Sequence, residues 1–296
     1  MSANAAGLRV AAAAGRRAGA RRLFGGAQGQ VRLLRLLLAG MLAAPAIFFV
    51  FWMLSLSFKT EIENIDYPPT FLPGAPTLQN YVDVFEKNDM LRYLGNSLLV
   101  TGLATGIGLL LGLPAAYAIA RLRLQRLGAM VLLARMTPAL SYLIPLFFIS
   151  KYAGLAGTLW PVVLAHLLIT VPLITWTMIS HFQAVPREIE EAAAIDGATL
   201  FQLLWQIVIP LVRPGIVIAV VIAAMFSWNN FIFSVILSSS EWRTLPVAIF
   251  GVMSFEQLSW GPLAAAAFVV TAPMLLMAGT LMRFMVSGLT AGATKG

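Results

Sequence analysis

The stretch Glu188–Gly215 reads EIEEAAAIDGATLFQLLWQIVIPLVRPG and interrupts an otherwise apolar chain with charged residues. Four acids fall within its first nine residues. Each ionised side chain at the centre of a bilayer costs roughly 2.5–3.5 kcal/mol on insertion scales. The stretch is therefore predicted to be a loop at the membrane surface rather than a membrane span.

The composition is that of an integral membrane protein. Of 296 residues, 59% are hydrophobic and 11% are charged, whereas a soluble domain is about a quarter charged. The absence of cysteine excludes disulfides and thiol catalysis, and two histidines argue against a His-rich metal site. The net charge of +8 comes mainly from arginines beside apolar runs, which is typical of membrane topology rather than nucleic-acid binding.

Six apolar runs are long enough to cross a bilayer, which takes about 20 residues. We therefore expect an all-α membrane protein with six transmembrane helices. The predicted spans are 33–57, 96–120, 128–150, 158–180, 215–237 and 261–285. They form a membrane domain over residues 31–286, preceded by a disordered basic tail at 1–30 and followed by a tail at 287–296.

The distribution of Lys and Arg predicts the orientation of these spans. Fourteen of the twenty basic residues lie in segments on one side of the six runs and five lie on the other. By the positive-inside rule, both termini and the loop at 181–214 are expected to be cytoplasmic. The largest outer loop, at 58–95, is proline-rich, and its sequence fits either a solvated connector or a docking surface for an external protein.

Local chemistry predicts two short helices in the loop. Pro186 suits the first position of a helix, and the acids that follow lie near the positive end of its dipole. Gly197 can end this helix in a left-handed conformation. Thr199 and Gln202 fit a capping box that starts a second helix. Leu200, Leu203, Leu204 and Ile207 would give that helix one apolar face.

The order of residues in the loop resembles the EAA signature of ABC-importer permeases. Glu191-Ala192-Ala193 is followed after three residues by Gly197 and after nine more by Ile207-x-Ile209-Pro210. The resemblance implies that the first short helix is a coupling helix in a groove of a cytoplasmic ATPase subunit. The coupling residues that it implies are Glu190, Glu191, Ala192, Ala193, Asp196, Gly197, Ile207 and Pro210.

The resemblance extends from about Leu33 to the C-terminus. FSWNNFIFSVIL at 226–237 is similar to the fifth span of carbohydrate-type permeases, although Asn230 stands where an acid is common. GLTAGATKG at 288–296 resembles the tail of the second permease subunit of maltose-type importers. The chain is therefore expected to be a carbohydrate permease subunit in the bacterial inner membrane.

This resemblance also implies partners for the chain. They are a homologous second permease, two ATPase subunits, an extracytoplasmic solute-binding protein and a carbohydrate solute. Because no segment matches GxxxxGK[ST], the chain is expected to hold no ATP itself, and ATP and Mg would be bound by the ATPase subunits. It is thus expected to be a transport subunit and not an enzyme.

Polar residues within the spans are candidates for the solute pathway, because they are costly in lipid. Trp228, Asn229 and Asn230 offer a stacking face and amide groups that suit sugar hydroxyls, although Asn also bonds helices together in membranes. Arg135, inside the third run, either faces a watery cavity or snorkels to the headgroups. The mid-span His166 is expected to be a hydrogen-bonded packing residue.

Two functions other than import are compatible with an apolar chain that carries a charged loop. An ion-coupled secondary transporter is expected to place acids within its spans, and none occurs in the six runs. A non-transporting membrane scaffold would use the loop only to dock a cytoplasmic partner. The solute stays open between a disaccharide, a monosaccharide, a polyol and an anionic sugar derivative.

Overall fold

The computed structural model describes residues 31–252 and 259–293, and the predicted tail at 1–30 lies outside these ranges. The regular elements within them are all helices, which confirms the all-α prediction. The chain divides into two compact units, Met1–Leu54 and Ser55–Gly296. The fold of the second unit carries the loop and the other predicted site residues.

The first unit is represented by most of one long helix, Val31–Ser57, which covers the first predicted span. It has 27 residues and a mean hydropathy of 2.2, so it is about 40 Å long and can cross the roughly 30 Å hydrocarbon core. Within it, the rings of Phe48 and Trp52 stack with their centroids 6.0 Å apart.

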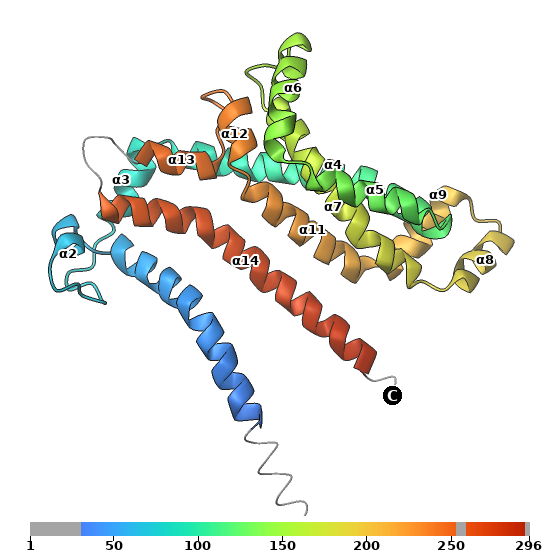
Figure 1. Ribbon diagram of the computed structural model, residues 1–296, viewed down its shortest axis with the longest axis horizontal. Coiled ribbons are helices and arrows are strands. Elements are labelled where there is room, and N and C mark those ends of the chain that lie inside the picture. The colour runs from blue at the N-terminus through green and yellow to red at the C-terminus, as the bar shows by residue number, and fades with distance from the viewer. Residues whose placement is uncertain (1–30, 253–258, 294–296) are drawn as a thin grey trace, which may run out of the picture. The chain divides into compact units, whose positions relative to one another are not determined.

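The second unit is a series of helices joined by short connections (Figure 1). Three of these helices, α4, α7 and α14, are long, and the others are shorter or bent. In chain order they are α2 (Glu61–Ile65), α3 (Gln79–Lys87), α4 (Met90–Arg121), α5 (Gln125–Met136), α6 (Ala139–Tyr152), α7 (Trp160–Gln183), α8 (Arg187–Ile195), α9 (Leu200–Gln202), the π-helix η1 (Leu203–Val208), α10 (Ile209–Leu211), α11 (Arg213–Trp228), α12 (Ile232–Leu237), α13 (Leu245–Val252) and α14 (Trp260–Ala293).

Four described helices are long and apolar enough to cross a membrane, and six spans result if each of two bent pairs counts as one. The four are Val31–Ser57, Met90–Arg121, Trp160–Gln183 and Trp260–Met282. The outer loop predicted at 58–95 holds α2 and α3 and ends earlier than expected, because α4 already begins at Met90. At the other end, α14 continues to Ala293, so most of the tail predicted at 287–296 is helical.

The third predicted span, 128–150, is not one continuous helix. It is divided into α5 and α6, which meet at an angle of 86°. Thr137 has an extended backbone with ψ of 129°, because the ring of Pro138 disfavours the helical conformation in the residue before it. The prediction of an unbroken span was wrong here because it weighed hydrophobicity above the proline.

The fifth predicted span, 215–237, is also interrupted. Helix α11 ends at Trp228, and α12 begins only at Ile232. The side-chain oxygen of Asn230 accepts a hydrogen bond from the backbone N–H of Phe233 at 3.0 Å. This bond replaces a backbone acceptor and favours a new helix start over continuation.

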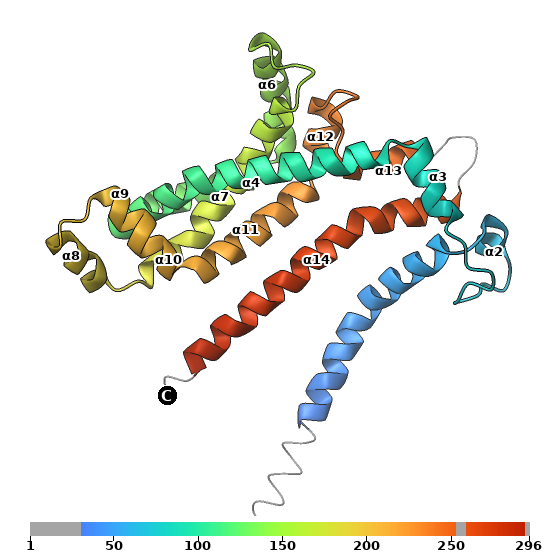
Figure 2. The same cartoon turned by 180° about the vertical axis from the view of Figure 1, so that it is seen from behind.

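The core of the unit is built on close packing of α4 against α7, which lie side by side in Figures 1 and 2. Small residues recur on α4 at every fourth position, and each is buried: Ala104, Gly108, Gly112, Ala116 and Ala120. Such a row lets two helix backbones approach closely in a membrane. Thr170 of α7 completes the contact by donating a hydrogen bond to the carbonyl of Ala104 at 2.8 Å.

A buried polar contact joins α11 to this pair. The Nδ1 atom of His166 on α7 lies 2.8 Å from the hydroxyl of Ser227 on α11, and Ser227 is 3.5 Å from the hydroxyl of Thr101 on α4. The prediction that His166 is a hydrogen-bonded packing residue is confirmed. The contact ties the three helices together at their apolar interface.

Polar side chains hold together one end of the unit, and the loop of interest lies at the other end. At the end that holds α3 and α13, the amide of Asn96 donates to the carbonyls of Glu241 and Arg243 at 2.7 and 3.0 Å. At the same end, the Glu61 carboxylate accepts from the first two N–H groups of α14. The opposite end of α4 and α7 carries the α8–α9 loop (Figure 2).

The close approach of α4 to α7 at Gly108 leads to a testable prediction. A Cβ atom at Gly108 would lie 2.9 Å from the Thr170 hydroxyl oxygen, whereas one at Gly106 meets no atom within 4 Å. Gly108→Leu should therefore lower the free energy of unfolding by about 1–3 kcal/mol, the usual cost of overpacking. Thermal unfolding of the purified chain in detergent measures it, with Gly106→Leu as the matched control. Equal melting temperatures for the two variants would contradict the packing described.

Candidate functional site

The candidate site is the loop between α7 and α11, which begins with the short helix α8. Pro186 immediately precedes α8, and Glu188 and Glu190 lie in its first turn, where they interact favourably with the helix dipole. The helix ends as predicted at Gly197, which has a φ of +85°. The N–H groups of Gly197 and Ala198 bond to the carbonyls of Ala194 and Ala193, a glycine-terminated Schellman arrangement.

The second half of the loop starts with the predicted capping box. The Thr199 side chain accepts from the backbone of Gln202, and the Gln202 side chain accepts from the backbone N–H of Thr199. The apolar face predicted for this helix was partly wrong. Leu204 and Val208 are buried, whereas Leu200 is 70% exposed. Leu203 and Ile207 of the predicted face are half-buried, and Leu203–Val208 forms the π-helix η1 instead of continuing the α-helix that starts at Leu200.

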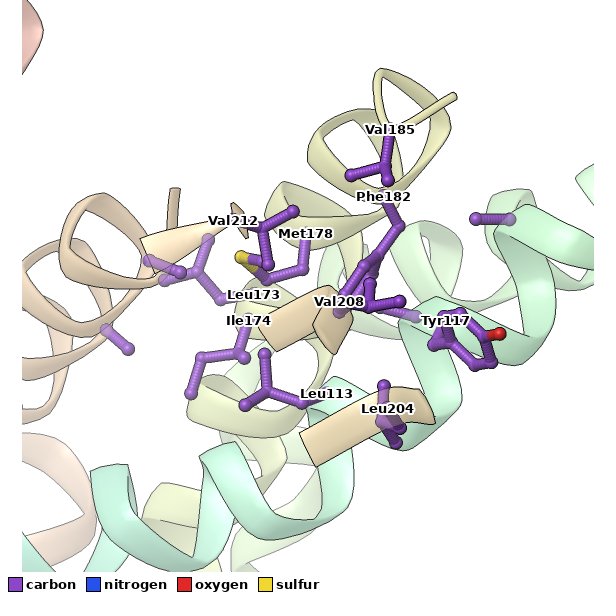
Figure 3. Packing of buried hydrophobic residues seen from close by; sticks show 14 residues of the cluster. Leu113, Tyr117, Leu173, Ile174, Met178, Phe182, Val185, Leu204, Val208 and Val212 are labelled. Atoms are coloured by element: carbon purple, nitrogen blue, oxygen red, sulfur yellow. The ribbon is translucent and has the colours of Figure 1, made fainter. Parts of the chain in front are cut away.

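Leu204 and Val208 connect the loop to the membrane helices. They pack in a cluster with Leu113 and Tyr117 of α4 and with Phe182 at the end of α7 (Figure 3). Val212, just before α11, belongs to the same cluster. The second half of the loop is therefore part of the hydrophobic core rather than a free surface segment.

The helix α8 is anchored to α4 by a buried ion pair. Glu190 pairs with Arg121, the last residue of α4, and the two side chains are only 11% and 13% exposed. The Tyr117 hydroxyl, one turn earlier on α4, donates to the Glu190 carboxylate at 2.8 Å. Two further hydrogen bonds hold the same segments together. Arg121 donates to the carbonyl of Val185 at 3.2 Å, and Arg187 donates to the carbonyl of Arg121 at 2.8 Å. We call this set of contacts between the end of α4 and the start of α8 the Arg121–Glu190 joint.

The aromatic ring of Tyr117 packs between the Arg121 side chain and the ring of Phe182. The Arg121 guanidinium lies 5.8 Å from its centroid, within the range of a cation–π contact. The ring of Phe182 meets the same Tyr117 ring edge-on, with centroids 5.6 Å apart. Neither Arg121 nor Tyr117 was singled out as a site residue from the sequence, because no local pattern shows that they meet Glu190.

The predicted coupling residues thus separate into two groups. Glu190 and Ala193 face the membrane helices, and Ala193 is 8% exposed. Ile207 and Pro210 are half-buried. Glu191, Ala192, Asp196 and Gly197 are exposed. The exposed group is available to a partner, whereas the Glu190 carboxylate is already engaged within this chain.

Large apolar side chains project from the end of the loop. Ile195 is 86% exposed, Leu200 70% and Phe201 68%. They lie beside the acidic residues Glu191 and Asp196 in a segment too charged to be buried in lipid. Exposed apolar side chains gathered with charges mark a protein contact site more often than a random surface. The sequence alone suggested no such role for Ile195.

The predicted solute-pathway residues at the end of α11 do not all face outward. Trp228 is 2% exposed, and its indole N–H donates to the carbonyl of Val270 on α14 at 3.1 Å. Its ring is therefore unavailable to a solute in this conformation, contrary to the expected stacking role. Asn229 is exposed, and Asn230 is half-buried with its oxygen bonded to the backbone of Phe233.

Arg135 lies in the last turn of α5, directly before the bend between α5 and α6. Its guanidinium is 4.4 Å from the centroid of the Phe226 ring on α11, which is a cation–π distance. The side chain is half-buried and forms no ion pair with any residue that the structure describes. Arg135 and Asn229 stay candidates for contact with a solute.

The chain is similar to known membrane transport components. The family model described as "Binding-protein-dependent transport system inner membrane component" matches residues 108–290. The sulfoquinovosyl glycerol transport system permease protein of Agrobacterium fabrum is 33% identical over 267 residues, covering 89% of this chain and 94% of that protein. The trehalose transport system permease protein of Mycobacterium tuberculosis is 35% identical over 255 residues, covering 83% and 92%.

A solved structure shares the fold. It is a bacterial ABC transporter involved in the import of the acidic polysaccharide alginate, and the matched chain has a TM-score of 0.70 at 20% identity. The match covers 89% of this chain and 97% of that one. The arrangement of membrane helices and connecting loop is therefore that of an ABC-importer permease.

The ion pair of Arg121 and Glu190 can be tested by removing one charged partner or by replacing both partners with apolar residues. Glu190→Ala leaves a buried guanidinium without a carboxylate and should lower the free energy of unfolding by about 3–5 kcal/mol. The double variant Arg121→Leu/Glu190→Leu leaves no buried charge and should recover most of that loss. Thermal unfolding in detergent measures both.

The control is the exposed pair of Arg92 and Asp89, whose side chains are 55% and 63% exposed. Arg92→Ala should leave the melting temperature unchanged, because exposed pairs contribute little. A Glu190→Ala variant as stable as the Arg92→Ala variant would show that the joint is not an energetic anchor.

Proposed function

The chain belongs to the family of inner membrane components of binding-protein-dependent transport systems, and we propose that it is one of two permease subunits of an ATP-driven carbohydrate importer. Each permease would form half of the translocation pore. The solute class is supported by relatives whose names specify sulfoquinovosyl glycerol and trehalose transport. The ligand common to these names is a small saccharide or a glycoside.

The loop end supports coupling to an ATPase subunit. Ile195 projects into solvent beside exposed Glu191 and Asp196. The next residue, Gly197, has no side chain, so its exposed backbone is accessible to a partner. Such a surface suits an apolar pocket rimmed by basic residues on the partner. We assign that pocket to a P-loop ATPase subunit, which would bind the ATP and Mg that this chain has no motif to hold.

The proposed orientation places α8 and both termini in the cytoplasm. The excess of Lys and Arg on the side of the α8–α9 loop supports it. Two ATPase subunits would then bind from the cytoplasm, one to each permease. A solute-binding protein would approach the opposite end, where α2, α3 and α13 lie (Figure 1).

The anchored loop gives a route from ATP to the pore. ATP binding would close the ATPase dimer and draw the two α8 helices together. Because Arg121 at the end of α4 pairs with Glu190 of α8 and also donates to the Val185 carbonyl just after α7, the displacement would pass to α4 and α7 together. The permeases would open outward to receive solute, and hydrolysis would return them to the inward-facing state.

The contact proposed for Ile195 is tested by a charge. Ile195→Asp should weaken binding of the ATPase subunit about 30-fold or more, because burying a carboxylate in an apolar pocket removes a central contact. Co-purification of the ATPase with the tagged chain measures it. Leu72→Asp is the matched control, since Leu72 is 69% exposed in the outer loop. Unchanged co-purification of the Ile195→Asp variant would rule out this docking surface.

The role of Gly197 is tested by two substitutions that differ in backbone preference. A Cβ atom at Gly197 meets nothing within 4 Å of this chain, so any penalty there comes from its φ of +85° or from a partner. Gly197→Val should reduce uptake into proteoliposomes about tenfold, because a left-handed valine costs roughly 1–2 kcal/mol. Gly197→Asn, which tolerates this conformation, should retain more uptake. Normal uptake by the valine variant would contradict the role of this turn.

A further inference from the structure

Three clefts meet at the turn between α4 and α5, on the same end of the unit as α8. The first has a volume of about 570 Å³ and is lined by Arg121, Arg123 and Arg187 with one acid, Glu188. The second, of about 520 Å³, contains Arg123 and Arg126 together with Leu127 and Met130. The third, of about 380 Å³, runs between α5 and α7. Gln125 lines all three, so they adjoin one another at this side chain.

The basic side chains at this turn are not all engaged within the chain. Arg121 pairs with Glu190, and Arg187 donates to a backbone carbonyl. The guanidinium groups of Arg123 and Arg126, by contrast, have neither an ion pair nor a hydrogen bond with any residue that the structure describes. Two guanidinium groups without partners therefore lie close together, Arg123 in the turn and Arg126 in the first turn of α5, and Glu188 is the only acid among the described residues that line the clefts.

The backbone at Arg123 is unusual for this residue type. Arg123 has a φ of +54°, and the N–H of Leu124 after it bonds to the carbonyl of Ile119. This is the position that closes a helix C-terminus, which glycine usually occupies because it has no Cβ atom. An arginine is accommodated here in spite of the left-handed conformation, which places a positive charge at the mouth of the clefts.

The third cleft adjoins this basic turn and lies between α5 and α7, which belong to the helices that are apolar enough to cross a membrane. It is lined by Ile119, Gly128, Trp176 and Ile179, with Gln183 at its outer end. Trp176 lies seven residues before the end of α7, which is about 10 Å along a helix. Apolar side chains of two membrane helices suit an acyl chain better than a segment of a soluble protein.

We propose that an anionic phospholipid occupies these clefts, with its phosphate on Arg123 and Arg126 and one acyl chain along Ile119, Gly128, Trp176 and Ile179. A basic pocket between membrane helices on the cytoplasmic side suits such a headgroup, and the apolar continuation distinguishes a lipid from a free phosphate. Because Arg121 and Arg187 line the same cleft, the lipid would stabilise the root of α8. The inference rests on the orientation proposed above for α8 and does not depend on the transported solute.

The test uses the full-length chain, purified in detergent and stripped of lipid. Native mass spectrometry with added dioleoyl-phosphatidylglycerol or dioleoyl-phosphatidylcholine counts bound lipid, and thermal unfolding reports its effect on stability. We expect one phosphatidylglycerol to bind in preference to phosphatidylcholine. Arg123→Gln/Arg126→Gln should weaken it about 25-fold, at about fivefold per arginine. Arg123→Gly, which relieves the backbone at this position, should fold well and still lose affinity.

Matched controls separate charge from shape. Lys151→Gln/Arg243→Gln removes the same charge from exposed residues elsewhere and should leave binding unchanged. Ser180→Phe, at an exposed position lining the third cleft, should weaken binding without a change of charge. Equal binding of the two lipids, full binding by the Arg123→Gln/Arg126→Gln variant, or displacement by sn-glycerol 3-phosphate alone would overturn the proposal. Loss of phosphatidylglycerol on assembly with the ATPase would assign the clefts to that partner instead.

Discussion

The position of the loop depends on one buried ion pair, between Arg121 at the end of α4 and Glu190 in the first turn of α8. Removing two charges from water is costly, and their attraction repays that cost only when further hydrogen bonds satisfy both groups. The Tyr117 hydroxyl donates one such bond to Glu190 and the Val185 carbonyl accepts one from Arg121, whereas the Nε atom of Arg121 is buried without a hydrogen-bond partner among the described residues. Removing only one partner would leave a buried charge unpaired and would destabilise the protein. The pair therefore fixes the position of α8 on α4, whether or not its net contribution to stability is favourable.

The close packing of the membrane helices determines what this joint can transmit. Small residues such as Gly108 and Gly112 bring α4 against α7, and the contact of His166 with Ser227 adds α11. Tightly packed interfaces shift between discrete arrangements rather than deforming gradually. A displacement of α8 would therefore reach three helices as one body, as alternating access requires.

Features set by neighbouring residues could be predicted from the sequence, and those set by distant ones could not. The apolar runs indicated the spans, and Gly197 and the Thr199–Gln202 capping box were confirmed because both act within one turn. The bend at Pro138 had a local signal that hydrophobicity outweighed. The burial of Val208 against α4 and α7 and the pairing of Glu190 with Arg121 depend on tertiary packing, which no periodicity reveals.

The most direct test of this account is the distance between α8 and α4 in the assembled importer through its ATP cycle. The chain has no cysteine, so Leu122→Cys and Ala192→Cys create unique sites for spin labels in this chain, at exposed positions directly after α4 and on α8. Pulsed electron–electron double resonance should give the same distance between the two spin labels without nucleotide and with ATP bound, because α8 and α4 move together. A distance that changes between the two states would show that α8 moves independently and would contradict transmission through the Arg121–Glu190 joint.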